Sequence, residues 1–394
     1  MNQQAVILGA GNIGRGFFGQ LFSESGYHVV FVDVDVPLAE ALRTEGAYTL
    51  RLVDNAGEEE VRVGPVKALL AQDVDAVAEA IASASLGATA VGARALPHIA
   101  PLVAEGIRRR AERDVEDPLN IIVGENLADA ARVFHDLVAE RLPESWRGYM
   151  QTHIGFVDTV IGRMVPTPPP ELREENPSLI IAEPYKELPV DAADFVGEVP
   201  AVVGMQPVAD FAVYAARKLY VHNAGHAILG YLGYHKGLEM GYDALEDPDI
   251  RPILDGALQE AARGIAARYG ADEASLRRHV DDLLARFANR ALADPVVRLA
   301  RDPLRKLAPE DRLVGAARVA EFAAAVPVYL AWGIAGALAY DEPSDPMATE
   351  LQRRIDAHGV ENVLESLCGI RSTEALGVAV RTRFRMLREG GSWS

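Results

Sequence analysis

One short stretch of the sequence combines residue types that can take a proton from an alcohol. Lys218, Asn223 and His226 fall within it, and in a helix of about 100° per residue they project from one side, within about 140° of arc. Burial beside apolar neighbours such as Leu219 would favour the neutral lysine amine. A neutral amine can accept a hydroxyl proton while amide and imidazole N–H groups bind the oxygen. The same spacing fits a surface lysine beside a core histidine, and both interpretations stay open here.

A metal ion is the other common means of activating an alcohol. His222 and His226 have the i, i+4 spacing that lets two histidines share a metal on a helix. Asn223 stands where the zinc-protease pattern requires glutamate, and Cys368 is the single cysteine of the chain. We therefore expect no metal site.

A glycine-rich turn near the N-terminus predicts where a dinucleotide cofactor binds. Gly9, Gly11 and Gly14, with Asn12 and Ile13 between them, form the pattern G-x-G-x-x-G. The pattern follows a short buried strand at residues 5–8 and opens a helical stretch, and a second strand is expected at residues 28–32. This context predicts a βαβ unit whose glycines let the backbone approach a pyrophosphate.

An acidic residue at the end of the second strand indicates which dinucleotide is bound. Asp33 lies 19 residues after Gly14, where a carboxylate accepts hydrogen bonds from the adenosine ribose and repels a 2′-phosphate. NAD is therefore expected rather than NADP. Asp35, two residues further on, is a nearby rival, and Arg15 is open between a phosphate contact and solvent.

Further strands and helices predict a chain of two parts. Residues 1–200 are expected to form a Rossmann-type NAD-binding domain with a β-rich extension, and residues 201–394 a mainly α-helical substrate and catalytic domain. The overall class is α/β. The expected strands are 88–92 and 120–124, with a hairpin of 49–53 and 60–67 turning at 55–57, and the expected helices are 98–113, 211–234, 251–269, 273–290, 311–340 and 347–367. The cluster Arg108-Arg109-Arg110 is expected to be a solvated helix end.

Asn126 follows the last predicted strand of the first domain, in Gly124-Glu125-Asn126. The carboxyl end of a parallel sheet is where ligands bind, so the Asn126 amide can donate to a substrate oxygen. Equally, Asn126 can cap a helix that begins at Leu127.

Composition limits the partners and the location. The chain has 39 Lys and Arg against 57 Asp and Glu, a formal net charge of −18, which disfavours nucleic acid. An anionic small molecule would need a local cationic pocket. No secretion signal or membrane segment is evident, so we expect a cytoplasmic protein without a membrane partner, and the oligomeric state is left open.

Several motifs together resemble the polyol-specific long-chain dehydrogenases over nearly the whole chain. The resemblance rests on the segments 9–16, 124–126, 155–158, 163–166 and 303–307, and on Lys218 with Asn223 and His226. It implies a metal-independent reaction with Lys218 as general base, Asn126 and Asn223 as oxyanion-stabilising amides, and His226 as a substrate-binding residue. Gly162 departs from the pattern, since relatives often carry Asp before the following arginine.

The length of the chain is similar to that of the phosphate-using branch of this family. The resemblance then implies reversible, NAD-dependent oxidation of mannitol 1-phosphate to fructose 6-phosphate, with Arg305 and Lys306 as candidates for binding the phosphate. An unphosphorylated polyol or a hexuronate is the alternative substrate, and an NAD-binding module without turnover is the alternative outside enzymes. A β-hydroxyacid dehydrogenase is disfavoured, because its lysine and asparagine are usually four residues apart, whereas Lys218 and Asn223 are five apart.

Overall fold

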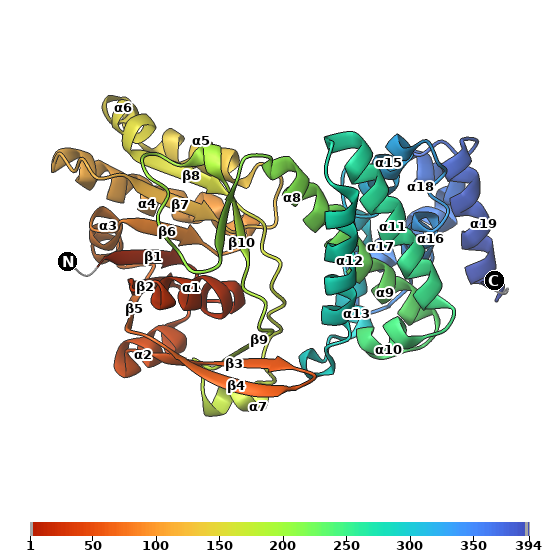
Figure 1. The fold of residues 1–394 in the computed structure, drawn as a ribbon, viewed down its shortest axis with the longest axis horizontal. Coiled ribbons are helices and arrows are strands. Elements are labelled where there is room, and N and C mark those ends of the chain that lie inside the picture. Colours follow the sequence, from red (N-terminus) through yellow and green to blue (C-terminus); the bar gives the residue numbers. More distant parts are fainter. Residues whose placement is uncertain (1–2, 391–392, 394) are drawn as a thin grey trace. The chain divides into compact units, whose positions relative to one another are not determined.

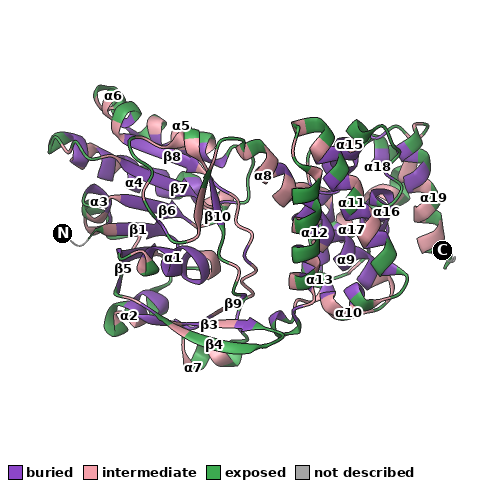
Figure 2. Cartoon of the chain, in the orientation of Figure 1, coloured by how far each residue is buried: buried purple, intermediate pink, exposed green. Residues whose placement is uncertain are grey.

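The computed structural model describes residues 3–390 and residue 393. These residues form two compact units, which we call the N-terminal unit, up to Phe211, and the C-terminal unit, from Ala212 (Figure 1). Each unit has its own buried interior (Figure 2). No helix of the described chain is long and apolar enough to cross a membrane.

A six-stranded parallel sheet organises the N-terminal unit. Its order is β5-β2-β1-β6-β7-β8, so the chain fills one side of β1 and then crosses to the other. Val6 of β1, for example, pairs with Val30 of β2 and Gly87 of β6. This reversal of strand order beside β1 is the switch point at which α/β sheets bind ligands, and it confirms the predicted Rossmann-type class. The strands are β1 (Gln4–Leu8), β2 (His28–Asp33), β5 (Val66–Leu70), β6 (Leu86–Thr89), β7 (Leu119–Val123) and β8 (Ile154–Asp158).

The alternation of side chains along these strands builds one apolar layer on each face of the sheet. Ile7 and Phe31 pack with the phenylalanines of the first helix, whereas Val6 and Val30 pack against Val103 of α4. The described helices of this unit are η1 (Gly14–Gly19), α1 (Gln20–Glu24), α2 (Val36–Glu45), α3 (Val74–Ala82), η2 (Ala93–Ala95), α4 (Leu96–Glu112), α5 (Ala130–Arg141), α6 (Glu144–His153), α7 (Pro170–Glu175) and η3 (Ala192–Asp194).

The predicted hairpin is present, but its second strand begins and ends earlier than the expected range 60–67. β3 (Tyr48–Asp54) pairs antiparallel with β4 (Gly57–Val63), and Asp54 Oδ1 accepts from the N–H groups of Ala56 and Gly57 in the turn. The chain then leaves the hairpin, and Val66–Leu70 joins the main sheet beside β2. The expected range 60–67 had merged two strands of different sheets. β9 (Ile180–Ala182) extends the hairpin, and β10 (Leu188–Asp191) pairs with β11 (Met205–Val208).

The predicted solvated arginine cluster on α4 is wrong for one of its members. Arg108 pairs with Glu105 near the surface, as a helix-end cation should. Arg110, however, is 2% exposed, and its Nη1 donates to the carbonyls of Ala82 (2.9 Å) and Ala84 (2.7 Å). Arg110 thus ties the end of α3 to α4, a role that depends on neighbours distant in sequence.

Helices form the described C-terminal unit. α16 is buried at every residue and α9 at most of its residues, and they form the centre of the unit (Figure 2). The expected helix 311–340 is wrong as one element, because Ala324, in the left-handed region, and Pro327 separate α15 from α16. α19 was not predicted. The helices are α8 (Phe211–Arg217), η4 (Lys218–Asn223), α9 (Ala224–His235), α10 (Gly241–Glu246), α11 (Ile250–Tyr269), α12 (Glu273–Phe287), η5 (Arg290–Leu292), α13 (Val296–Ala300), α14 (Pro303–Lys306), α15 (Val314–Ala320), η6 (Glu321–Ala323), α16 (Leu330–Ala339), α17 (Pro346–His358), α18 (Val360–Ser366) and α19 (Ala375–Glu389).

Candidate active site

The three glycines of the N-terminal loop have different surroundings. Gly9 has φ +103°, and a Cβ there would lie 2.5 Å from the carbonyl oxygen of Ala90. A Cβ on Gly14 would lie 2.0 Å from the carbonyl oxygen of Gly9. A Cβ on Gly11 would meet no atom within 4 Å. Gly9 and Gly14 are therefore required by the packing of the chain itself, whereas Gly11 leaves open space where a pyrophosphate can approach the backbone.

Asp33 is held rigidly beside this loop at the end of β2. Its Oδ2 accepts from the N–H of Ala10 (2.6 Å), and its Oδ1 accepts from the N–H groups of Val34 (2.7 Å) and Asp35 (3.0 Å). The rival carboxylate of Asp35 has another task, since it caps α2 by accepting from the N–H of Leu38. Of the two carboxylates, Asp33 is the one joined to the glycine loop.

The polar side chains within and after the loop face the protein. Asn12 Nδ2 donates to the carbonyl of Val165 (3.3 Å) and to Thr167 Oγ1 (3.1 Å), so only its backbone faces the loop opening. Neither alternative for Arg15 is right: Arg15 is 7% exposed, and it donates to the carbonyls of Ala10 (2.6 Å) and Ser178 (2.5 Å). Arg15 therefore fastens the glycine loop to a distant segment.

A second buried arginine explains why the segment 163–166 is distinctive. Arg163 Nη1 donates to the carbonyl of Gly16 (2.9 Å) and to Gln20 Oε1 (2.6 Å), and its Nε donates to the carbonyl of Glu183 (2.7 Å). A Cβ on Gly16 would lie 2.6 Å from Val165. This segment supports the helix that follows the glycine loop.

Asn126 is exposed directly after β7, at the carboxyl end of the parallel sheet. The helix-cap alternative is wrong, because α5 begins at Ala130, whose neighbour Ala131 donates its N–H to Asp158 Oδ1 (2.8 Å). The residue before Asn126 is a buried carboxylic acid. Glu125 Oε2 accepts from the Thr89 hydroxyl and Oε1 from the N–H of Val91 (2.9 Å), and burial raises the Glu125 pKa.

Lys218 and Asn223 form the first and last residues of a π-helical turn. The prediction of ordinary α-helical spacing is wrong here, because η4 has the wider i→i+5 turn. Residues five apart in such a turn lie on one face, so Lys218 and Asn223 share a face more closely than the α-helical angles suggested. Lys218 is half-buried. Asn223 is 8% exposed, and within the described chain its Nδ2 has no hydrogen-bond partner.

His226 is positioned by rings rather than by a carboxylate. It stacks on Phe287 with centroids 4.1 Å apart, and His222 meets it edge-on at 5.0 Å. Burial lowers the pKa of both histidines well below the usual value. Both imidazoles are thus neutral near pH 7, and each has one N–H to donate. Among the described residues no group of three histidine, cysteine or acidic side chains converges as metal ligands do.

The geometry gives no support to the phosphate role expected for Arg305 and Lys306. Lys306 is 4% exposed, its Nζ donates to the carbonyl of Leu299, and burial lowers its pKa well below the usual value. Arg305 pairs with Asp302 (3.0 Å) and approaches Asp311 (3.7 Å). Both cations are engaged within the C-terminal unit.

Comparison with known proteins identifies the family. Residues 3–204 match the mannitol dehydrogenase Rossmann domain, and residues 210–374 match the mannitol dehydrogenase C-terminal domain. The chain belongs to the mannitol dehydrogenase family. The chain is 40% identical to mannitol-1-phosphate 5-dehydrogenase of Brevibacillus brevis over 390 residues, covering 99% of each chain. It is 36% identical to the enzyme of that name from Bacillus subtilis over 373 residues, covering 94% of this chain and 97% of the relative.

Two solved structures have the same fold as this mannitol dehydrogenase family member. A substrate-free D-sorbitol dehydrogenase has a TM-score of 0.82 at 18% identity, covering 99% of this chain and 94% of its own. Pseudomonas fluorescens mannitol 2-dehydrogenase, solved with NAD and D-mannitol, has a TM-score of 0.78 at 18% identity, covering 99% and 93%. As a member of this enzyme family the chain is an oxidoreductase, so the binding module without turnover is not retained.

Two residues that shape the site of this mannitol dehydrogenase family member were not predicted from the sequence. Glu125 stood inside a recognised motif, but its partner Thr89 is 36 residues away. Phe287 gave no signal for its contact with His226, since the two lie on different helices.

Proposed function

We propose that this chain catalyses the NAD-dependent, reversible oxidation of mannitol 1-phosphate to fructose 6-phosphate without a metal ion. Relatives named mannitol-1-phosphate 5-dehydrogenase, 34–40% identical over nearly their full length, support the choice of substrate. We assign cofactor binding to residues 1–200 and proton transfer to residues 201–394. The observation that carries the chemistry is the buried, unpartnered Asn223 Nδ2, within the described chain, one π turn from Lys218.

The residues of the glycine loop fit NAD. The open space at Gly11 and the backbone N–H groups of Asn12 and Ile13 in the first helical turn suit a pyrophosphate. The fixed carboxylate of Asp33 suits the ribose hydroxyls and disfavours a 2′-phosphate. NAD, when bound, supplies the hydride acceptor.

Lys218 takes the proton from the substrate hydroxyl. The amine must be neutral to do so, and the Lys218 side chain is half-buried. His226, neutral and held by Phe287, orients the substrate with its N–H. In the reverse direction Lys218 returns the proton to the forming alcohol.

The two asparagines bind the oxygen as its charge grows. A buried amide without a partner is costly for the fold, and an oxygen that becomes anionic relieves this cost most when the charge is greatest. A donor of this kind contributes about 2.7–4 kcal/mol to the transition state. Asn126, exposed after β7, is proposed as the second donor.

Replacement of Lys218 tests the role of the base. Lys218→Ala should lower kcat at least 100-fold and leave the Kd for NAD within about twofold, since a general base contributes about 10²–10⁴-fold. Lys236→Ala is the matched control, because Lys236 pairs with Asp249 away from the π turn. Near-normal turnover in Lys218→Ala would contradict the mechanism.

The substrate is tested separately with the unaltered enzyme. NADH formation should be fastest with mannitol 1-phosphate, compared with mannitol and, in the reducing direction, fructuronate. A preference for either unphosphorylated compound would contradict the substrate assignment and leave the Lys218 result standing. Undiminished activity after dialysis against EDTA is expected for a reaction without a metal.

A further inference from the structure

Arg217 is a cation with an unusual setting in the C-terminal unit. It ends α8 directly before Lys218, is half-buried, and lies 4.6 Å from the centroid of the Tyr214 ring. Within the described chain no carboxylate lies within ion-pair distance of it, although most arginines on these helices face an acidic partner. The cation–π contact with Tyr214 restrains the guanidinium without using its N–H groups, which can then donate to an anion.

The surroundings of Arg217 are positive in a chain of net charge −18. The charges that act most strongly on His279 of α12 are those of Arg217 and Arg286. Together with burial, the larger cause, they lower the His279 pKa to about 3. Such a local field attracts an anion that the rest of the surface would repel.

Arg286 is a second cation near His279, and both residues belong to α12. They are seven residues apart, so they lie on the same helix face. Arg286 approaches one carboxylate, Asp282, at 3.7 Å on its own helix. Asp282 therefore offsets part of the Arg286 charge on this face.

We infer that Arg217 binds the phosphate group of the substrate by charge-assisted hydrogen bonds, with Arg286 adding to the positive field. This inference rests on the proposed function, because it requires a phosphorylated substrate. Arg217 adjoins Lys218 in the chain. Binding of the phosphate by Arg217 therefore selects which hydroxyl of the polyol, counted from the phosphate, lies at the base. The residue therefore determines both the preference for a phosphate ester and the carbon that is oxidised.

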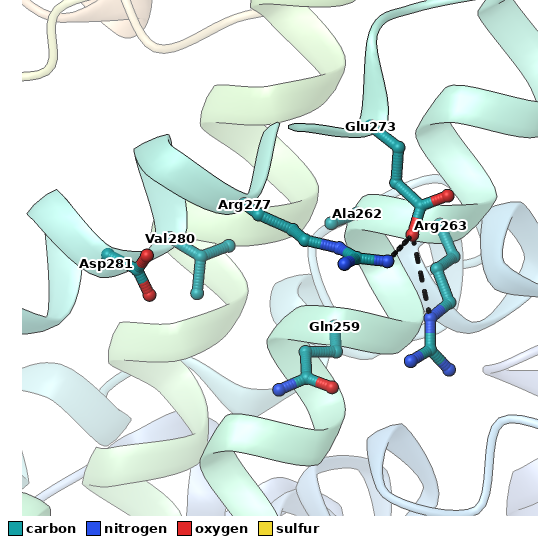
Figure 3. Close-up of a pocket in the computed structure, with 7 residues that line it drawn as sticks. All are labelled: Gln259, Ala262, Arg263, Glu273, Arg277, Val280 and Asp281. Atoms are coloured by element: carbon teal, nitrogen blue, oxygen red, sulfur yellow. Dashed lines mark hydrogen bonds and ion pairs between the residues drawn. The ribbon is translucent and has the colours of Figure 1, made fainter. Parts of the chain in front are cut away.

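A cavity between α11 and α12 is the rival site for an anion in the same unit. It has a volume of about 190 Å³ and is lined by Gln259, Arg263, Glu273, Arg277 and Asp281 among others (Figure 3). Its two arginines both turn to Glu273, with Arg277 hydrogen-bonded to it and Arg263 at 3.9 Å. The lining carries Arg263 and Arg277 against Glu273 and Asp281 and so has no net charge, whereas no carboxylate of the described chain pairs with Arg217.

The cavity supplies a matched control for the experiment. Arg217→Met removes the charge and keeps much of the side-chain volume, Arg217→Lys keeps the charge and loses the bidentate fork, and Arg277→Met removes a charge from the rival site. The KM for mannitol 1-phosphate, the competitive inhibition constant of inorganic phosphate, and the selectivity for mannitol 1-phosphate over mannitol are measured for each.

Arg217→Met should raise the KM for mannitol 1-phosphate about 10- to 100-fold, weaken inhibition by inorganic phosphate, and lower the selectivity by a similar factor. Arg217→Lys should recover part of each loss, and Arg277→Met should behave like the parent. An unaltered selectivity in Arg217→Met, with a parent that prefers mannitol 1-phosphate, would overturn this inference alone. A parent without that preference would overturn the proposed substrate, and the inference with it.

Discussion

His226 stacks on Phe287 with ring centroids 4.1 Å apart and ring planes 28° from parallel. Phe287 ends α12, whereas His226 lies on α9, so the contact joins two helices. A substrate-binding imidazole usually has its second nitrogen fixed by a hydrogen bond. Here a buried aromatic face restricts the ring, and the N–H is directed by packing.

Phe287→Leu should therefore impair substrate binding more than it impairs folding. The loss of stacking costs about 0.5–1.5 kcal/mol, and the freed His226 ring should raise the KM for the polyol phosphate several-fold. Phe322→Leu, at a site that is 58% exposed, is the control for a phenylalanine replaced on the surface. Steady-state kinetics and thermal unfolding check both effects, and an unchanged KM would show that the contact does not position His226.

Gly11→Ala and Gly14→Ala separate cofactor binding from folding. A Cβ at Gly11 meets nothing within 4 Å, so the variant should fold normally and bind NAD at least tenfold more weakly. A Cβ at Gly14 would lie 2.0 Å from the carbonyl oxygen of Gly9, so this variant should lose stability as well. Gly148→Ala, in open space within α6, should be neutral or stabilise by up to about 1 kcal/mol. Calorimetry measures both NAD binding and unfolding. Normal NAD binding by Gly11→Ala would contradict this prediction.

Glu125→Ala should disturb the loop that carries Asn126. The Thr89 hydroxyl and the Val91 N–H would lose their acceptor inside the protein, at about 1–3 kcal/mol for each unsatisfied group. We expect a lower melting temperature and a lower kcat, and milder effects in Glu125→Gln, which keeps an acceptor oxygen. Glu59→Ala on the exposed strand β4 is the control. An unchanged kcat in Glu125→Ala would separate Glu125 from the position of Asn126.

The N-terminal architecture was predictable because its signals are local. The strand, the glycine turn and Asp33 fall within some thirty residues, and the parallel sheet follows from repeating that unit. Arg15 and Arg163 were not predictable, because they donate to carbonyls 163 and 147 residues away along the chain. A buried arginine and a surface arginine look alike in a sequence until the fold brings carbonyls to one of them.

The catalytic stretch was found for its residue types, but its geometry was not. A single π turn leaves no periodic pattern in the sequence, so Lys218 and Asn223 were placed with α-helical angles. Arg305 and Lys306 show the opposite difficulty, since two adjacent cations suggest a phosphate site, but only the fold shows that Leu299 and Asp302 already engage them. Adjacent charged residues in a sequence are therefore a poor indicator of a binding site until the groups that pair with them in the fold are known.

The buried histidines make stability depend on pH in a direction that can be tested. The His279 pKa is lowered to about 3 in the folded protein, chiefly by burial, against about 6.5 in an unfolded chain. Below pH 6.5 the unfolded chain therefore binds more protons, and the free energy of unfolding falls by up to about 1.4 kcal/mol per pH unit for each such group. Above pH 6.5 both states are neutral and this contribution does not change.

His279→Gln should accordingly flatten the loss of stability between pH 7 and pH 5.5. Urea unfolding at half-unit steps across this range measures the slope, and the range stays above most carboxyl titrations. His358→Gln, at an exposed site in the last turn of α17, should keep the parental slope. Equal slopes for parent and His279→Gln would mean that His279 takes up its proton as readily in the folded chain as in the unfolded one, and that the positive, desolvated surroundings on this face of α12 are not as the structure describes them.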